Sequence, residues 1–529
     1  MSSTESSPKP QEKASSKPAK GKEATDGSKL FGKYDLNKIF SREAIDFDLL
    51  CQLTHMSALS TAGMYRAKLF EGTASLSYST SKYFRQVHLV AQRLNYDYSR
   101  ACEVVAETIK VESVRNLLLH FATSLSSGET EEQFLSREAA LQLETYGKEY
   151  EQRVESLQKW SDAYVALMVS ATLVVVISMV SMMIYPFSPV AIIGLAGLMV
   201  CVTFIGGWLI FTVAPIEVKT HSLSYKSPEQ VRAAMLAKIL LPLATIFGIG
   251  VGWFFGLPYA LIIASVIIAP VGYMAMLDDR KIDARDRDIA TFVRGLGSVM
   301  GSASISVTDG LSRLNRRSLG SLESLVRYLY IRLKNGISPD LCWLRLAAES
   351  GSEVVTRCVR IFWDGVRMGG DTEKVAAFAS EYALKIYLLR TDRRLVSNTF
   401  SWVAVPLHGV LIGILLFITE VVQVFGAELA KVQQESLQGD LAAEAGVGEA
   451  LLFQFPALEF IPMFVGTVVL MLTASNSFAP YAAAGGHRLK LCLYGSVMML
   501  ISGLALIFIP QLVQSVFQNV ATPPGGPGP

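Results

Sequence analysis

Charged residues are scarce in this chain of 529 residues: Asp, Glu, Lys and Arg make up 18% of it, whereas hydrophobic residues make up 51%. Soluble globular chains carry about 25% charged residues. The shortage leaves long uncharged stretches, which are candidates for membrane-spanning helices. The net charge is only +2 and no long basic run occurs, so the sequence does not indicate a nucleic-acid partner.

Motifs of catalytic and metal sites are also missing. The six cysteines are scattered without a CxxC pair, which excludes a zinc ribbon or disulfide framework and is typical of a reducing compartment. The patterns HExxH, GxxxxGK[ST] and GxSxG do not occur. His55, His88 and His120 have no ligand partner three or four residues further on, so we expect core or surface histidines. We predict no enzyme activity, no metal and no cofactor.

Seven uncharged stretches are candidates for crossing a bilayer, for which about 20 apolar residues are needed. They are residues 163–185, 190–213, 239–255, 259–277, 402–425, 460–474 and 491–513; among the first four, the third is the shortest. Two polar regions show apolar residues at spacings of three and four, which is typical of helices. The sequence therefore predicts an all-α polytopic membrane protein with about seven transmembrane helices and two homologous helical cytoplasmic domains.

The expected organisation has six parts. These are a disordered Ser/Lys/Pro-rich tail (1–30), a first helical domain (31–162), four transmembrane helices (163–277), a second helical domain (278–401), three transmembrane helices (402–515, with an outer loop at 426–459) and a flexible tail (516–529). Basic residues gather on the cytoplasmic side of membrane proteins. The segment 426–459 holds a single Lys against several Glu and Asp, so it is expected outside. The N-terminus and both helical domains are then cytoplasmic, and the C-terminus lies outside.

The two polar domains resemble each other. SGETEEQFLSREA (127–139) and GGDTEKVAAFASEYA (369–383) both place Gly, an acid, Thr and Glu before an apolar helix. Gly128 and Gly370 suit the left-handed position that closes a helix. Each copy then continues through a charged helix into a membrane span, so we interpret the two regions as an internal repeat.

This duplication resembles the platform proteins of type II secretion and type IV pilus machines, the type II secretion system F-domain family. The resemblance covers roughly residues 35–515 and is closest to the archaellum branch, in STSKYFRQV (79–87), SSGETEEQFLSREA (126–139) and KWSDAYVALMVS (159–170). In the second domain the family's hairpin glycine, Gly63 in the first, is replaced by Ala303 or Ser304.

The resemblance implies a cell-membrane platform that couples a separate hexameric secretion ATPase to insertion of filament subunits, archaellin or pilin. It also implies a homo-oligomer in contact with the lipid bilayer. Alternatives are the platform of an archaeal adhesion pilus or of a type II-like secretion system, or a membrane transporter. A transporter should show polar residues near span centres.

Basic clusters in the second domain are the candidate contacts for the ATPase. They are Arg313, Arg316 and Arg317 in an expected hairpin loop, and Arg390, Arg393 and Arg394 just before the fifth span, where attraction to anionic lipid is the competing interpretation. Glu420 lies near the outer end of that span. It either reaches the membrane interface or contacts a filament subunit.

Overall fold

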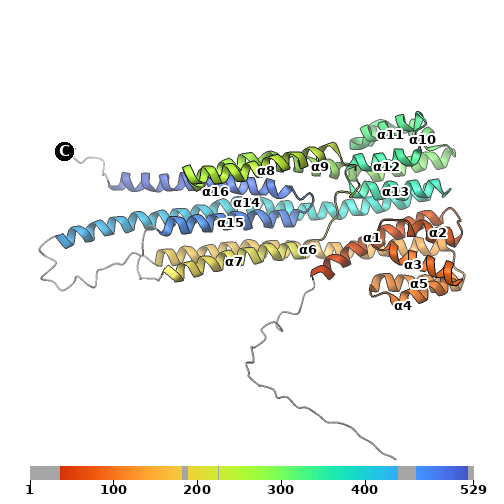
Figure 1. The fold of residues 1–529 in the computed structure, drawn as a ribbon, viewed down its shortest axis with the longest axis horizontal. Coiled ribbons are helices and arrows are strands. Elements are labelled where there is room, and N and C mark those ends of the chain that lie inside the picture. The colour runs from red at the N-terminus through yellow and green to blue at the C-terminus, as the bar shows by residue number, and fades with distance from the viewer. Residues whose placement is uncertain (1–35, 182–188, 224, 439–459, 522–529) are drawn as a thin grey trace, which may run out of the picture.

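The computed structural model describes residues 36–181, 189–223, 225–438 and 460–521. Within these ranges the chain is helical and forms no β-strand, apart from one antiparallel β-bridge between Thr220 and Ser352. The prediction of an all-α protein is confirmed. Figure 1 shows an elongated molecule, with a bundle of long helices at one end and shorter helices gathered at the other.

The short helices form two groups with the same order. The first group comprises α1 (Leu36–Ser60), α2 (Arg66–Ala74), α3 (Ser81–Leu94), α4 (Tyr98–Thr108), α5 (Glu112–Ser127) and the start of α6 (Glu131–Ser181). The second comprises the end of α9 (Leu257–Ala303), α10 (Val307–Arg313), the 3₁₀ helix η2 (Arg316–Leu322), α11 (Glu323–Lys334), α12 (Pro339–Ser350), α13 (Glu353–Arg367) and the start of α14 (Thr372–Gln438). This parallel supports the predicted internal repeat.

Left-handed backbone positions recur at matching turns of the two groups. When only α-helices are counted, the first of each group is followed by Gly63 (φ 59°) or Ser304 (φ 48°), the third by Asn95 (φ 55°) or Gly336 (φ 75°), and the fifth by Gly128 (φ 78°) or Gly369 (φ 86°). Ser304 therefore keeps the left-handed geometry that Gly63 has in the first domain. The turn is preserved although the residue differs.

The expected role of Gly370 needs correction. Gly369, and not Gly370, occupies the left-handed position after α13. The Gly370 N–H donates to the Gly365 carbonyl at 3.0 Å, and the Gly369 N–H donates to Val366 at 3.0 Å, which together form a Schellman motif. A Cβ on Gly370 would lie 2.5 Å from Thr61 Oγ1 in the first domain. Gly370 is thus suited to close contact between the domains.

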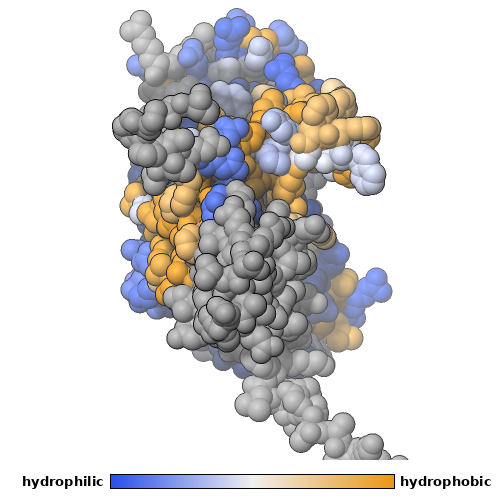
Figure 2. Space-filling view, turned by 90° about the vertical axis from the view of Figure 1, so that its left-hand side faces the viewer, coloured by the Kyte–Doolittle hydropathy of each residue, from blue (hydrophilic) through white to orange (hydrophobic). Residues whose placement is uncertain are grey.

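Among the described residues, six helices are long and apolar enough to cross a membrane: α6, α8 (Pro228–Phe255), α9, α14, α15 (Phe460–Ala484) and α16 (Lys490–Ala521). In α7 (Pro189–Val213) the stretch Gly197–Val213 is a shorter apolar helix. The most apolar stretch of α15 is 56% buried, against 11% for α8, so α15 is central and α8 peripheral. Seen from the bundle end, hydrophobic residues form patches at the left and upper right of the view, beside hydrophilic ones (Figure 2). The chain is a multi-pass membrane protein.

Three helices run without a break from the polar domains into the apolar bundle: α6 from the first domain, and α9 and α14 on either side of the second (Figure 1). The predicted domain boundaries at 162, 277 and 401 therefore fall inside continuous helices. Residues 426–438 extend α14 instead of forming a loop, and residues 516–521 extend α16 instead of forming a tail. Residues 1–30, the rest of the expected outer loop at 439–459 and the end of the chain at 522–529 lie outside the described residues.

The two polar domains pack against each other through α1. Phe47, Leu50 and Cys51 of α1 belong to the core of the second domain, whereas Leu49 and Leu53 belong to the core of the first. This division follows from helical periodicity, which places the two sets on different faces of α1. A single helix is therefore shared by both cores.

Polar contacts reinforce the same boundary. Arg357 of α13 is buried, pairs with Asp48 of α1 at 2.7 Å, and lies over the rings of Phe47 and Tyr78. His55 Nε2 lies 3.0 Å from Asp364 Oδ2. The two domains are thus joined by an apolar core, a buried ion pair and a histidine contact.

Candidate functional site

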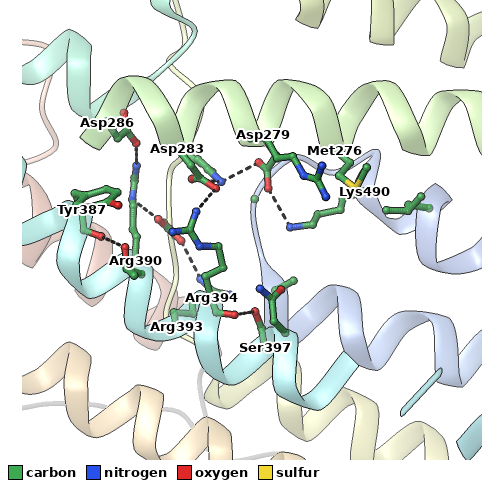
Figure 3. A pocket seen from close by; sticks show the side chains of 18 of the residues that line it. Met276, Asp279, Asp283, Asp286, Tyr387, Arg390, Arg393, Arg394, Ser397 and Lys490 are labelled. Atoms are coloured by element: carbon green, nitrogen blue, oxygen red, sulfur yellow. Dashed lines mark hydrogen bonds and ion pairs between the residues drawn. The ribbon is translucent and has the colours of Figure 1, made fainter. Parts of the chain in front are cut away.

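A cluster of charged side chains, most of them buried, lies where the polar domains meet the membrane bundle. We call it the junction cluster; its members are Glu217, Lys219, Asp279, Asp283, Asp286, Arg390, Arg393, Arg394 and Lys490. They come from the segment between α7 and α8, from α9, from α14 and from the first residue of α16 (Figure 3). A cavity of 270 Å³ lies among them. Every polypeptide segment that contributes here also leads into the bundle.

Arg390 of α14 is the centre of the buried part. Its guanidinium pairs with Glu217 and, at 2.6 Å, with Asp286 of α9. It also donates to the Val218 carbonyl at 3.1 Å. The side chains of Arg390 and Asp286 are only 8% and 1% exposed. These contacts tie α14 to α9 and to the segment after α7.

Arg393 joins α14 to the end of α15. It pairs with Glu217 at 3.2 Å and donates to the carbonyls of Pro215, Ala482 and Ala483 at 2.8, 3.3 and 3.1 Å. Ala482 and Ala483 lie in the last turn of α15, where backbone carbonyls have no partner within the helix. Arg393 therefore satisfies the end of one membrane helix from another.

A second set of pairs surrounds the cavity. Lys219 lies 3.1 Å from Asp279 and 2.6 Å from Asp283, and Lys490 lies 3.0 Å from Asp279. Arg394 pairs with Asp283 at 3.0 Å, but its side chain is 42% exposed. Because Lys490 begins α16, this set connects α9, α14 and α16 at the level where they enter the bundle.

Burial and neighbouring charges shift the pKa values of Glu217 and Asp286, the two buried carboxyls that pair with Arg390. Burial disfavours charged Glu217, but attraction from Arg390, Arg393 and Lys219 outweighs it and lowers the pKa below the ordinary 4.5. For Asp286, burial outweighs the attraction of Arg390 and raises the pKa above 3.8. Glu217 has more cationic neighbours, which explains the opposite directions. Burial would also lower the pKa of Arg390, but Glu217 and Asp286 raise it above its usual value.

The structure separates the arginines that the sequence singled out. Arg313 ends α10 and is exposed, whereas the side chains of Arg316 and Arg317 lie outside the described part of the structure. Arg390 and Arg393 are buried in ion pairs of their own chain, so a partner cannot reach them in this conformation. The reason is that carboxylates of α9 and of the segment after α7 face α14. Arg394 alone of that trio keeps a substantial exposed surface.

Glu420 lies toward the end of α14 that is far from the polar domains, and it is half-buried. Its Oε1 accepts a hydrogen bond from Gln514 Nε2 of α16 at 2.8 Å. The contact joins α14 to α16, and it leaves the Glu420 carboxylate with a partner inside the protein.

A series of hydrogen-bonded polar side chains, which the sequence did not indicate, runs through the bundle. Tyr164 Oη donates to Asn476 Oδ1 at 2.9 Å, Asn476 Nδ2 lies 2.9 Å from His408 Nδ1, and His408 Nε2 lies 2.9 Å from Ser502 Oγ. These residues come from α6, α15, α14 and α16, and all are buried. Interhelical hydrogen bonds of this kind join membrane helices. Since all partners are side chains of the bundle itself, we interpret these hydrogen bonds as contacts that hold the membrane helices together.

The histidines of the first domain have individual partners. His55 contacts Asp364, His88 Nδ1 lies 3.2 Å from the Tyr98 hydroxyl, and His120 lies 3.7 Å from Glu138. Within the described ranges, no group of three His, Cys, Asp or Glu side chains is arranged to hold a metal ion.

Comparison with known proteins gives two relatives. The chain is 22% identical over 344 residues to the Flagella accessory protein J of Methanocaldococcus jannaschii, a match covering 62% of this chain and 61% of that protein. It is 20% identical over 346 residues to the protein of the same name from Methanococcus voltae, covering 61% and 60%. The matches thus span less than two thirds of these relatives. No protein-family model matches. The predicted resemblance to the archaellum branch is confirmed.

Proposed function

We propose that this protein is the membrane platform of an archaellum-type assembly machine, and that it transmits force from a cytoplasmic ATPase to the helices that handle filament subunits. The similarity to two flagella accessory proteins supports the class of machine. The observation that carries the mechanism is the unbroken course of α6, α9 and α14 from the polar domains into the bundle. A continuous helix transmits displacement that a flexible linker would absorb.

The junction cluster supports this mechanism. It joins α9, α14, α16 and the end of α15 at one level through buried ion pairs. Paired buried charges have few alternative arrangements, because separating them leaves a charge without a partner in a low-dielectric site. A movement of the second domain would therefore shift several membrane helices together. The protein itself has no role in chemistry in this proposal and acts as a mechanical coupler.

Within this proposal the ATPase binds the second domain near the end of α10. Arg313 is exposed there, and Arg316 and Arg317 follow within a few residues along the chain. Arginine suits an acidic partner surface because its planar fork binds carboxylates bidentately. We place the contact at this cluster and not at Arg390 and Arg393, which are engaged inside the protein.

Charge reversal tests the ATPase contact and the proposed function together. Replacing Arg313, Arg316 and Arg317 with Glu should weaken co-purification with the cognate secretion ATPase at least tenfold, since three like charges would face an acidic surface. Wild-type binding should weaken with salt. Filaments counted by electron microscopy should fall in parallel. The matched control is Arg294, Arg327 and Lys334 changed to Glu, three exposed basic residues on α9 and α11 of the same domain. Normal binding and filaments in the first variant would contradict the contact.

We further propose that the N-terminus and both polar domains face the cytoplasm, and that the 426–459 segment and the C-terminus lie outside. A membrane-impermeant thiol reagent checks this orientation in intact cells. It should label Ser436→Cys and should not label Lys334→Cys, which lies in the exposed last turn of α11. The reverse pattern would overturn the proposed topology.

Filament subunits and further copies of this chain are the remaining proposed partners. Several bundle residues present apolar side chains outward, including Trp253, Phe254 and Phe255 at the end of α8, which are 85%, 80% and 70% exposed. Lipid, a subunit or a second copy can cover such a surface. Glu420 remains a proposed subunit contact. The platform of an adhesion pilus or a type II-like secretion system is the alternative within the same class; loss of swimming with intact adhesion in a deletion strain would favour the archaellum.

A further inference from the structure

The cavity in the junction cluster has an excess of positive charge. Its wall includes six basic side chains, Lys219, Arg280, Arg390, Arg393, Arg394 and Lys490, against four acidic ones, Glu217, Asp279, Asp283 and Asp286. The buried basic side chains are held by the acidic ones. The excess positive charge therefore lies at the solvent-exposed part of the cavity, where Arg280 is exposed and Arg394 is half-exposed.

Arg280 lies at the cavity without a partner among the described residues. It lines the cavity, yet it forms no hydrogen bond or ion pair with any residue that the structure describes. Asn398, which also lines the cavity, likewise has no side-chain partner among the described residues. A guanidinium and an amide that face one cavity without partners, beside Arg394, form a set of donors suited to an anion.

The position of the cavity indicates where the anion comes from. Arg280 follows the last uncharged residue of its span, Leu277, by three residues, or about 4.5 Å along the helix. Lys490 directly precedes the uncharged stretch of α16. Met276 and Leu493 add apolar wall next to these charges. The cavity thus combines apolar side chains with cationic donors at the depth of the lipid headgroups, which form a layer several ångströms thick beside the hydrocarbon core.

We propose that this cavity binds the phosphate of an anionic phospholipid from the cytoplasmic leaflet, with Arg280 and Arg394 as its principal donors and Asn398 as a neutral one. The bound lipid would lie against α9, α14 and α16, so it would bridge the three helices that the junction cluster connects. The assignment to the cytoplasmic leaflet rests on the proposed orientation of the protein, but the site itself does not depend on the proposed assembly function. Basic pockets between membrane helices on the cytoplasmic side are suited to such headgroups.

Binding of fluorescent phosphatidylglycerol to the full-length protein in neutral detergent micelles tests the proposal. Arg280→Gln should weaken binding about tenfold, the loss expected for one charge-assisted hydrogen bond. Arg280→Lys keeps the charge and should recover part of the affinity. The matched control is Arg294→Gln, an exposed arginine on the same helix about 21 Å further into the second domain. Its affinity should equal that of the wild type.

Competition distinguishes the possible sources of the phosphate. Unlabelled phosphatidylglycerol should displace the probe, whereas phosphatidylcholine and inorganic phosphate should do so at least tenfold less well. Wild-type affinity in Arg280→Gln, or an equal loss in Arg294→Gln, would overturn the site and indicate general attraction to basic surface. Displacement by inorganic phosphate at the same concentration as lipid would overturn the lipid assignment. Because Arg280 has no partner among the described residues, its replacement leaves the ion pairs of the cluster in place.

Discussion

Replacing Arg390 with Met is expected to destabilise the folded protein by about 3–5 kcal/mol, the cost of removing one partner from a buried ion pair. The change leaves Asp286 without its cationic partner in a site where its side chain is 1% exposed. Glu217 loses one of its two arginines but keeps Arg393. The measurement is the midpoint of unfolding of the purified protein in detergent, monitored by tryptophan fluorescence.

The control for this result is Arg394→Met, four residues away from Arg390 along α14. Its pair with Asp283 is partly solvated, so the expected loss is about 1 kcal/mol or less. Adding Asp286→Asn to Arg390→Met removes the orphaned charge and should restore part of the stability. Equal losses in Arg390→Met and Arg394→Met, or no recovery in the double variant, would show that the buried pairs do not hold the junction together.

Weakening the helical conformation of α14 from the junction cluster to the membrane is expected to abolish filament assembly if this helix transmits force. Asp392, Leu395 and Thr399 are exposed positions in that stretch, so their replacement changes the helix without emptying a core. Glycine at all three should weaken the helix by about 2–3 kcal/mol relative to alanine. We expect filaments to fall by more than tenfold in the triple Gly variant. The measurement is the number of filaments on cells that produce the variant and lack the wild-type protein.

The triple Ala variant at the same positions is the matched control. It removes the same side chains but favours the helix, so near-normal filaments are expected. Both variants should be present in the membrane at wild-type abundance, and both should still bind the ATPase, because Arg313 is untouched. Normal filaments in the triple Gly variant would show that coupling does not pass through the stiffness of α14. The proposal would then depend on α6 or α9.

Patterns local to the chain were sufficient for the helical architecture. The absence of charge over about 20 residues is a direct physical requirement of the bilayer, so span positions could be read from composition. Gly128 was likewise predictable, because a left-handed helix end is a local property of the backbone. The Gly369–Gly370 pair was not resolved correctly, because either glycine tolerates the left-handed position and only packing against Thr61 distinguishes them.

The candidate site depended on contacts between distant segments. Asp279, Asp283 and Asp286 are spaced so that they lie along one face of α9, and Arg390, Arg393 and Arg394 are spaced similarly on α14. That complementary spacing was the available signal, but it does not show which helices are neighbours. Arg390 is an example. In the sequence, a basic residue before a membrane span looks the same whether its side chain faces lipid, a partner protein or a buried carboxylate.

The sequence by itself determined that this protein is helical, crosses the membrane several times and is built from two similar polar domains, because hydrophobic length, helical period and turn chemistry are all written in adjacent residues. Only the tertiary structure decided that α1 is shared by both domain cores, that Arg390 and Arg393 are internal, and that Tyr164, Asn476 and His408 form one chain of hydrogen bonds. The physical reason is that burial and ion pairing depend on which surfaces meet. Residues hundreds of positions apart become partners only when the helices that carry them pack together.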